Sequence, residues 1–187
     1  QACQTTSAAF SVIQSGQAVI ASGTVGYTVT SAFSSAQIIT VTVEGYGAPD
    51  YQYSLDDGPR QASNVFENVS MGTHVIHVWD AKGDIAYSCE ELIINEVMII
   101  DYPHYFTPNG DGIHDTWNIV GLEEQLGAKI FIFDRYGKLL KQISPAGAGW
   151  NGTYNGHLLP SDDYWFTVDF AEGGVMKQFK AHFAMKR

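Results

Sequence analysis

Short segments of alternating apolar and polar residues, separated by turns, constrain this chain more than any other feature. In residues 164–170 every second side chain is apolar or aromatic, and Val175–Met185 largely repeats the pattern after a turn at residues 171–174. A period of two places successive side chains on opposite faces of a strand, so it predicts half-buried strands and not helices. Only residues 122–126 are compatible with a short helix.

The same kind of segment recurs through the whole chain. The strands predicted in the first half are residues 11–14, 17–21, 25–30, 37–43, 51–55, 64–66, 73–80 and 91–95. Those predicted in the second half are residues 128–134, 138–143, 164–170 and 175–185. Many short strands joined by turns such as Asp56-Asp57-Gly58 are typical of an immunoglobulin-like sandwich.

These strands predict an all-β protein with two immunoglobulin-like antiparallel β-sandwich domains in tandem, residues 1–97 and 98–187. The boundary is expected near residues 96–103, because Asp101-Tyr102-Pro103 favours an extended connector. Residues 97–100 form an apolar run that we expect to pack as a first strand or against the neighbouring domain. A stiff connector follows from that packing.

The net charge of −10 is unevenly distributed. Residues 1–97 hold ten acids and two bases (−8), and residues 98–187 hold ten acids and eight bases (−2). Nucleic acid is not an expected partner, because neutralising phosphates requires a basic patch. Four bases gather late in the chain, at Lys177, Lys180, Lys186 and Arg187. They indicate either a lysine-protected edge strand or a docking site for a partner.

The two ends of the first half each have one cysteine, Cys3 and Cys89. In an exported protein they would form one disulfide that closes the first domain, and two unpaired thiols are the alternative. The chain begins with Gln1 and shows no signal peptide, so we expect a piece of a longer precursor. No apolar run approaches the roughly 20 residues that cross a bilayer.

Catalytic motifs are not found in this sequence. There is no G-x-S-x-G elbow, P-loop, H-E-x-x-H helix or G-x-G-x-x-G loop after a strand. His74 and His77 are three residues apart on a predicted strand, so they point to opposite faces and cannot share a metal without a bulge. Asp162 and Asp163, beside Pro160, are interpreted as turn formers. The sequence therefore predicts a protein that is not an enzyme.

One loop, residues 106–115, has residues suited to binding a ligand. Asn109, Asp111 and Asp115 place side-chain oxygens at relative positions 1, 3 and 7, and the glycines between them allow the backbone to fold inward. Calcium prefers six to eight oxygen ligands in such a loop. Asn-Gly and Asp-Gly are also the strongest turn signals. Both a calcium site and a simple turn remain open, and no other cofactor is indicated.

The same loop carries a family resemblance. Residues 105–117 resemble the F-[ST]-P-N-G-D-G-x-N-D opening of the gliding-motility-associated C-terminal domain, also called the type B sorting domain of the type IX secretion system. Further matches follow in order at residues 132–138, 150–156, 159–160, 163–166 and 179–187. His114 stands where the family usually has Asn.

The resemblance spans residues 102–187 and implies a secretion and surface-retention signal. Proteins of this type are exported by the type IX outer-membrane translocon, which recognises their folded C-terminal domain. A small β-barrel partner in the outer membrane then holds them at the cell surface. The protein would be extracellular and attached to the bacterial outer-membrane surface, with Lys180, Lys186 and Arg187 as partner-binding residues at the end of a long terminal strand.

The first half resembles, less specifically, the repeats of large gliding adhesins. Residues 51–58 meet the pattern Y-x-Y-S-L-D-x-G, and residues 72–83 largely meet G-T-x-x-V-x-V-x-D-A-x-G. An adhesin is therefore the expected parent protein. The alternative function is an extracellular carbohydrate- or protein-binding module with a platform of Tyr46, Tyr51 and Tyr53. Exposed rings would favour that platform and buried rings would exclude it.

Overall fold

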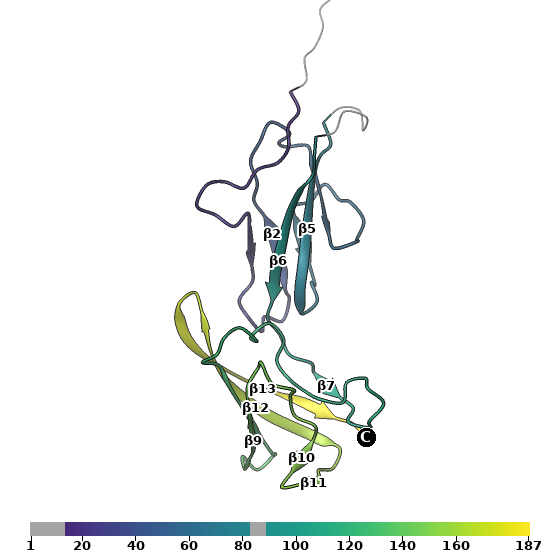
Figure 1. Cartoon of the computed structure of the whole chain (residues 1–187), viewed down its shortest axis with the longest axis vertical. Coiled ribbons are helices and arrows are strands. Elements are labelled where there is room, and N and C mark those ends of the chain that lie inside the picture. Colours follow the sequence, from purple (N-terminus) through teal and green to yellow (C-terminus); the bar gives the residue numbers. More distant parts are fainter. Residues whose placement is uncertain (1–13, 83–88) are drawn as a thin grey trace, which may run out of the picture. The chain divides into compact units, whose positions relative to one another are not determined.

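The structure, a computed structural model, describes residues 14–82 and 89–187. All regular secondary structure in these residues is β-strand, which confirms the predicted all-β class (Figure 1). Nothing in the described part of the chain forms a helix that could cross a membrane.

The chain divides into two compact units. The first consists of the described residues up to Thr28 together with Thr40–Phe66 and Val75–Asn95. The second consists of Val29–Ile39, Glu67–His74 and Glu96–Arg187. Two short segments of the first half thus belong to the second unit. The domain limits 1–97 and 98–187 and the immunoglobulin-like topology stay predictions.

The first half of the chain forms two three-stranded sheets. One has the order β1-β2-β4, with the strands Tyr27–Val29, Ile38–Val41 and Val65–Glu67. The other has the order β3-β5-β6, with the strands Tyr51–Leu55, Gly72–Asp80 and Leu92–Ile99. Every second side chain of β5 is buried from His74 to Asp80, as the alternation predicted. The strand predicted at residues 17–21 is wrong, because Val19 forms only an isolated bridge to Glu44.

Strand β6 runs continuously through the start of the predicted connector. Its burial alternation shifts at Glu96, whose φ of 58° lies in the left-handed region. As a result Ile94 and Val97 are both buried, although two exposed residues separate them. Because Glu96 interrupts the alternation, the sequence of the single strand β6 looks like two short segments, residues 91–95 and 97–100.

The second unit contains a five-stranded sheet in the order β7-β13-β12-β8-β9. Its strands are Tyr105–Phe106, Val175–Met185, Asp162–Glu172, Lys129–Phe133 and Leu139–Ile143 (Figure 1). Pairing is antiparallel except between β7 and β13, which run parallel. A separate hairpin is formed by β10 (Thr153–Tyr154) and β11 (His157–Leu158).

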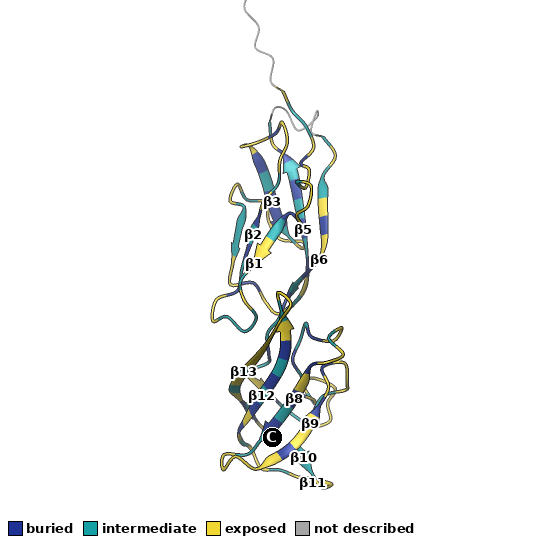
Figure 2. Ribbon diagram, turned by 90° about the vertical axis from the view of Figure 1, so that its left-hand side faces the viewer, coloured by how far each residue is buried: buried dark blue, intermediate teal, exposed yellow. Residues whose placement is uncertain are grey.

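One face of the five-stranded sheet covers an aromatic core. Buried and exposed positions alternate along β12, which Figure 2 shows as a striped strand. The ring of Phe183 stacks on Trp117 at 3.9 Å with an interplanar angle of 12°. Trp117 and Trp150 exchange two backbone hydrogen bonds of 2.9 Å, so both indoles are fixed in this core. The indole N–H of each tryptophan donates to a backbone carbonyl, that of Pro103 or Thr153. The polar edge of each ring is therefore satisfied.

The short helix predicted at residues 122–126 is wrong. The segment makes two successive turns, closed by hydrogen bonds from Gln125 N to Leu122 O and from Ala128 N to Gln125 O. The Gln125 side chain both donates to and accepts from the Ala171 backbone at 2.9 and 2.8 Å. Five residues cannot repay the cost of nucleating a helix. Burial of Leu122 and the hydrogen bonds between Gln125 and β12 favour turns instead. Leu126 is 93% exposed.

Within the second unit, Phe33 packs onto the sheet from the segment Val29–Ile39. Its ring stacks on Phe179 at 4.3 Å and meets Phe170 edge-on at 5.2 Å. Its backbone has a φ of 61°, and its N–H donates to the Ile100 carbonyl at 3.1 Å. A left-handed conformation costs a residue other than glycine about 1–2 kcal/mol. The ring contacts and the hydrogen bond hold Phe33 in it.

Candidate functional site

The candidate functional site is the C-terminal end of β13, where the sequence predicted the secretion signal. Ala184 N donates to His104 O at 2.8 Å, and Lys186 N donates to Phe106 O at 3.0 Å. On its other side β13 pairs with β12 along its whole length. Phe183 and Met185 point into the core, where each is 1% exposed. The end of the chain is therefore held between two strands.

The side chains of Lys186 and Arg187 are exposed but make contacts within the second unit. The Lys186 ammonium lies 5.2 Å from the centroid of the Tyr105 ring. Arg187 donates from its backbone N–H to Ser161 Oγ at 3.0 Å and from its guanidinium to Gly152 O at 3.2 Å. At Gly152, whose φ is 75°, a Cβ would collide with the Met185 sulfur.

The third predicted partner-binding residue, Lys180, is exposed on the same strand. It lies six residues before Lys186, or about 20 Å along an extended strand. The structure thus brings Lys186 and Arg187 together and leaves Lys180 apart. Sequence reasoning missed Tyr105, Gly152 and Ser161 as the residues that hold the basic end. Gly152 lies in residues 150–156, one of the segments that carry the family resemblance.

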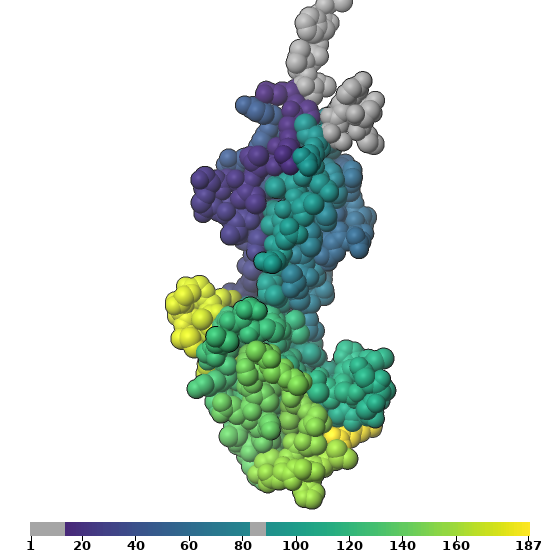
Figure 3. Space-filling model, in the orientation of Figure 1, coloured from purple at the N-terminus to yellow at the C-terminus, as the bar shows by residue number. Residues whose placement is uncertain are grey.

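The loop after β7 stands out from the unit beside the C-terminus (Figures 1 and 3). Asp115 closes it, because its carboxylate accepts hydrogen bonds from the backbone N–H groups of Asn109, Gly110 and Gly112 at 2.6–3.0 Å. Asn109 and Asp111 bond to each other through side chain and backbone at 2.8 and 3.0 Å. The three predicted ligands thus lie together, with their oxygens engaged by the loop itself.

These hydrogen bonds support the turn interpretation of the loop. The backbone N–H groups of Gly110, Gly112 and Asn109 stabilise the Asp115 carboxylate and hold its pKa below the ordinary value. Among the residues described, no three His, Cys, Asp or Glu side chains gather as a metal site. Calcium at Asn109, Asp111 and Asp115 stays a prediction. His114 has a φ of 53°, a conformation that Asn adopts readily, so the backbone accounts for the Asn usual at this position in the family.

The alternative of a tyrosine platform is excluded by burial of two of its three rings. Tyr51 and Tyr53 are buried core residues, and burial raises the pKa of both phenols. Of the three tyrosines, Tyr46 alone is exposed. The Tyr51 hydroxyl lies in a polar network in which it donates to Gly16 O at 3.2 Å. A single exposed ring does not make an aromatic row.

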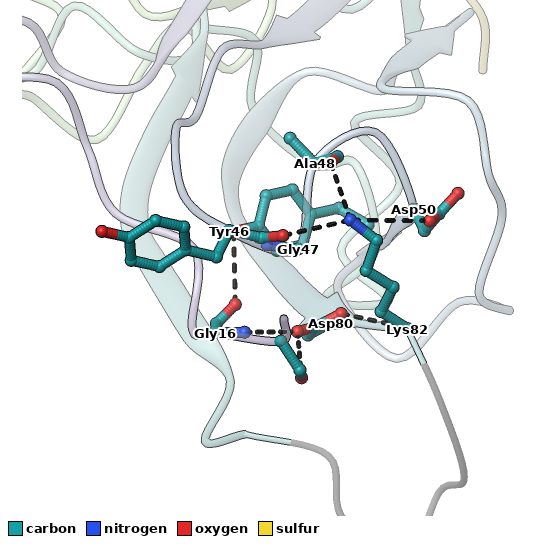
Figure 4. A network of polar contacts seen from close by, with 9 residues as sticks. Gly16, Tyr46, Gly47, Ala48, Asp50, Asp80 and Lys82 are labelled. Atoms are coloured by element: carbon teal, nitrogen blue, oxygen red, sulfur yellow. Dashed lines mark hydrogen bonds and ion pairs between the residues drawn. The ribbon is translucent and has the colours of Figure 1, made fainter. Parts of the chain in front are cut away.

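Asp80 is the charged centre of this network (Figure 4). Burial raises the pKa of Asp80, but hydrogen bonds from Ser15 Oγ and the N–H groups of Lys82 and Gly16 outweigh it and keep the pKa below its ordinary value. The Lys82 ammonium donates to the carbonyls of Tyr46 and Ala48, each at 3.2 Å. Every one of these contacts fixes a loop of the first unit, so the role of Asp80 is structural.

The predicted disulfide cannot be placed, because Cys3 lies outside the described residues. Cys89 is half-buried, and its sulfur lies 3.9 Å from Ser15 Oγ. The Cys3–Cys89 bond stays a prediction.

The second unit is thus a small all-β domain in which the buried side chains of Phe183 and Met185 anchor β13 to the core. Residues 100–184 match the CHU_C family, the Type IX secretion signal domain. The chain therefore contains a type IX secretion signal domain, and the predicted type B sorting family is confirmed. A comparison with curated proteins finds no match.

The match over residues 100–184 supports a C-terminal sorting signal for exported proteins. It implies an interaction with the secretion system and a location at the cell surface or outside the cell.

Proposed function

We propose that this chain is the C-terminal secretion and surface-retention module of an exported cell-surface protein, which the type IX outer-membrane translocon recognises through the folded second unit. The observation that carries the proposal is the position of β13. Its end pairs with β7 and β12 and anchors two side chains in the core. A partner that binds the C-terminal end of β13 in this conformation therefore requires the folded domain.

The first half supports an adhesin as the parent protein, through its resemblance to gliding-adhesin repeats at residues 51–58 and 72–83. In this proposal the role of the chain is not enzymatic, and a small β-barrel protein of the outer membrane retains it at the cell surface. Lys180, Lys186 and Arg187 supply positive charge to the partner from a chain whose net charge is −10. Complementary charge steers such encounters.

The test displays the full chain, fused to a reporter, in a bacterium with and without a working type IX translocon. The double variant Lys186→Ala/Arg187→Ala keeps both backbone hydrogen bonds of the chain end but loses the cation–π contact and the guanidinium bond. A cation–π contact at an exposed site contributes about 0.5–1 kcal/mol. We therefore expect a folded variant with reduced surface display.

The matched control is Lys129→Ala, an exposed lysine of the same unit on β8. It should leave display unchanged, and deletion of residues 183–187 should abolish display by unfolding the domain. Display of the wild-type chain without a translocon would refute the proposed function. If the double variant is displayed as well as the wild-type chain, the basic end is not the recognised site. The loop at residues 107–115 is then the next candidate.

A further inference from the structure

The strand β13 leaves much of one edge unpaired. On one side β12 pairs with it from Val175 to Met185, but on the other side β7 pairs only with Ala184 and Met185 (Figure 1). The described part of the chain places no other strand on that second side. Residues 176–182 therefore form an open edge of roughly 20 Å within the second unit.

The backbone groups along this open edge lack partners. Toward β7, Ala184 N donates to His104 O and Lys186 N donates to Phe106 O, so the even-numbered residues of β13 point their backbone groups to that side. By the same alternation the N–H and C=O groups at positions 176, 178, 180 and 182 face outward. Among the described residues, none forms a hydrogen bond with these groups. An unpaired edge of this kind is a template for a further strand.

The other edges of the five-stranded sheet are shorter or irregular. β7 has 2 residues, and β9 has 5, with a shift of register in its pairing with β8 between Ile132 and Phe133. Short and bulged strands are common protections against unwanted pairing. β13 has 11 residues and pairs with β12 without a shift. Its edge also carries apolar side chains that the fold covers only in part, since Met176 is 64% exposed and Phe179 is half-buried.

The open edge is complementary to itself when two copies of the chain run antiparallel. If position 179 of one copy lies opposite position 179 of the other, position 176 faces 182 and position 178 faces 180. Every outward N–H group of each copy then meets a carbonyl group of the other. A shift by two residues in either direction would set position 182 against the turn at Gly174, or position 176 against Ala184, which β7 already pairs. One register thus uses the whole edge.

The side chains that face each other in this register are compatible. On the outer face of the sheet, Lys180 lies opposite Gln178 of the second copy, and His182 lies opposite Met176. On the core face, the two Phe179 side chains lie side by side as a pair without mutual backbone hydrogen bonds, the closer of the two pair types. Lysine often prevents edge pairing, but here no lysine lies directly opposite another cation.

The remaining charges of the edge are compensated within each chain. Lys177 pairs with Glu172 of β12, and the Asp169 carboxylate accepts a hydrogen bond from Gln178 Nε2 at 2.7 Å. Residues 98–187 have a net charge of −2, whereas residues 1–97 have −8. Long-range repulsion between two copies is therefore weakest in the half of the chain that carries β13.

We propose that two copies of this chain pair through the open edge of β13, antiparallel and centred on Phe179. The two five-stranded sheets then form one continuous sheet. Residues 183–187 lie outside the paired stretch in both copies, so the chain end stays accessible to a secretion partner. The inference goes beyond the proposed function and does not depend on it.

Sedimentation velocity of the purified full chain, over a concentration series with and without reductant, tests this pairing. Monomer and dimer should interconvert with concentration in both conditions. Gln178→Lys should weaken the dimer about threefold, because it sets like charges opposite each other. Gln178→Lys combined with Lys180→Gln should restore the wild-type affinity, since each lysine then faces a glutamine again. Gln142→Lys, which changes an exposed glutamine of β9, is the matched control and should leave the dimer unchanged.

Amide hydrogen exchange gives a second readout of the same contact. The N–H groups at positions 176, 178, 180 and 182 should exchange more slowly as the concentration rises, whereas the odd-numbered ones are already bonded to β12. A chain that stays monomeric, or a dimer seen only without reductant, would overturn the proposal; a monomer would leave the edge to a strand of another protein. A dimer that Gln178→Lys does not weaken, or that the double variant does not restore, would overturn the stated register.

Discussion

Replacing Phe183 by Ala should cost the second unit about 4 kcal/mol of stability. The ring is 1% exposed and stacks on Trp117 at 3.9 Å. Truncation of a buried phenylalanine costs about 3–5 kcal/mol, and an aromatic pair contributes about 0.5–1.5 kcal/mol beyond the buried area. The rings of Phe106 and Phe166 lie 5.8 and 6.2 Å from the Phe183 ring and are themselves buried, so the change leaves a cavity in the aromatic core.

Urea unfolding followed by tryptophan fluorescence measures this loss, because Trp117, Trp150 and Trp165 all belong to the second unit. With an m-value of about 1–3 kcal/mol/M, a loss of about 4 kcal/mol lowers the midpoint by roughly 2 M urea. The control is Val175→Ala on the same strand. Its side chain is 60% exposed, so the change should stay within about 0.5 kcal/mol.

A midpoint for Phe183→Ala that matches the Val175→Ala control would refute the reasoning. The ring would then not be a core residue, and the chain end would not be fixed by burial. Recognition of the chain end would then not require the folded domain.

Three further predictions follow from single contacts. Phe33→Ala should destabilise the second unit by about 2–3 kcal/mol, because it removes a packed ring. Phe33→Gly should cost about 1 kcal/mol less than Phe33→Ala, since glycine adopts the left-handed conformation without strain. Equal losses of stability for the two variants in thermal unfolding would exclude the strain. Because the pKa of Asp115 is lowered in the fold, its contribution to stability is present above the ordinary carboxyl pKa of about 4 and is lost as the pH falls below it. Asp115→Asn should therefore flatten the acid limb of a stability–pH curve, and a parallel limb would contradict this. Mass spectrometry of protein isolated without reductant should find Cys3 bonded to Cys89, and two free thiols would refute that pairing.

Much of the fold could be predicted from alternation alone. The limits of β3 and β13 agree with the prediction residue for residue, because turn residues follow β3 at Asp56-Asp57-Gly58 and precede β13 at residues 171–174. β6 was harder to predict, since the left-handed backbone at Glu96 breaks its period and leaves no signature in composition. The sequence predicts Leu122 in a helix, but Leu122 is buried by a turn that Gln125 holds through a hydrogen bond from the distant Ala171.

The candidate site was only partly predictable for a similar reason. The loop around Asp115 could be found because its glycines and short polar residues are contiguous. Burial is the commoner outcome for an aromatic residue on a strand, and Tyr51 follows it, but a strand pattern does not say which of its two faces is covered. Lys186 and Tyr105 meet only through the fold, so no local pattern joins them.

The placement of Phe33 limits how this signal can be transplanted to other cargo. A tag cut at residue 98 would sever β6 and omit the segment Val29–Ile39, so Phe170 and Phe179 would lose the ring that packs on them. Failure of such a tag would report on an incomplete domain and not on a missing signal. A transferable version should therefore include the whole chain as given, even though the family match begins at residue 100.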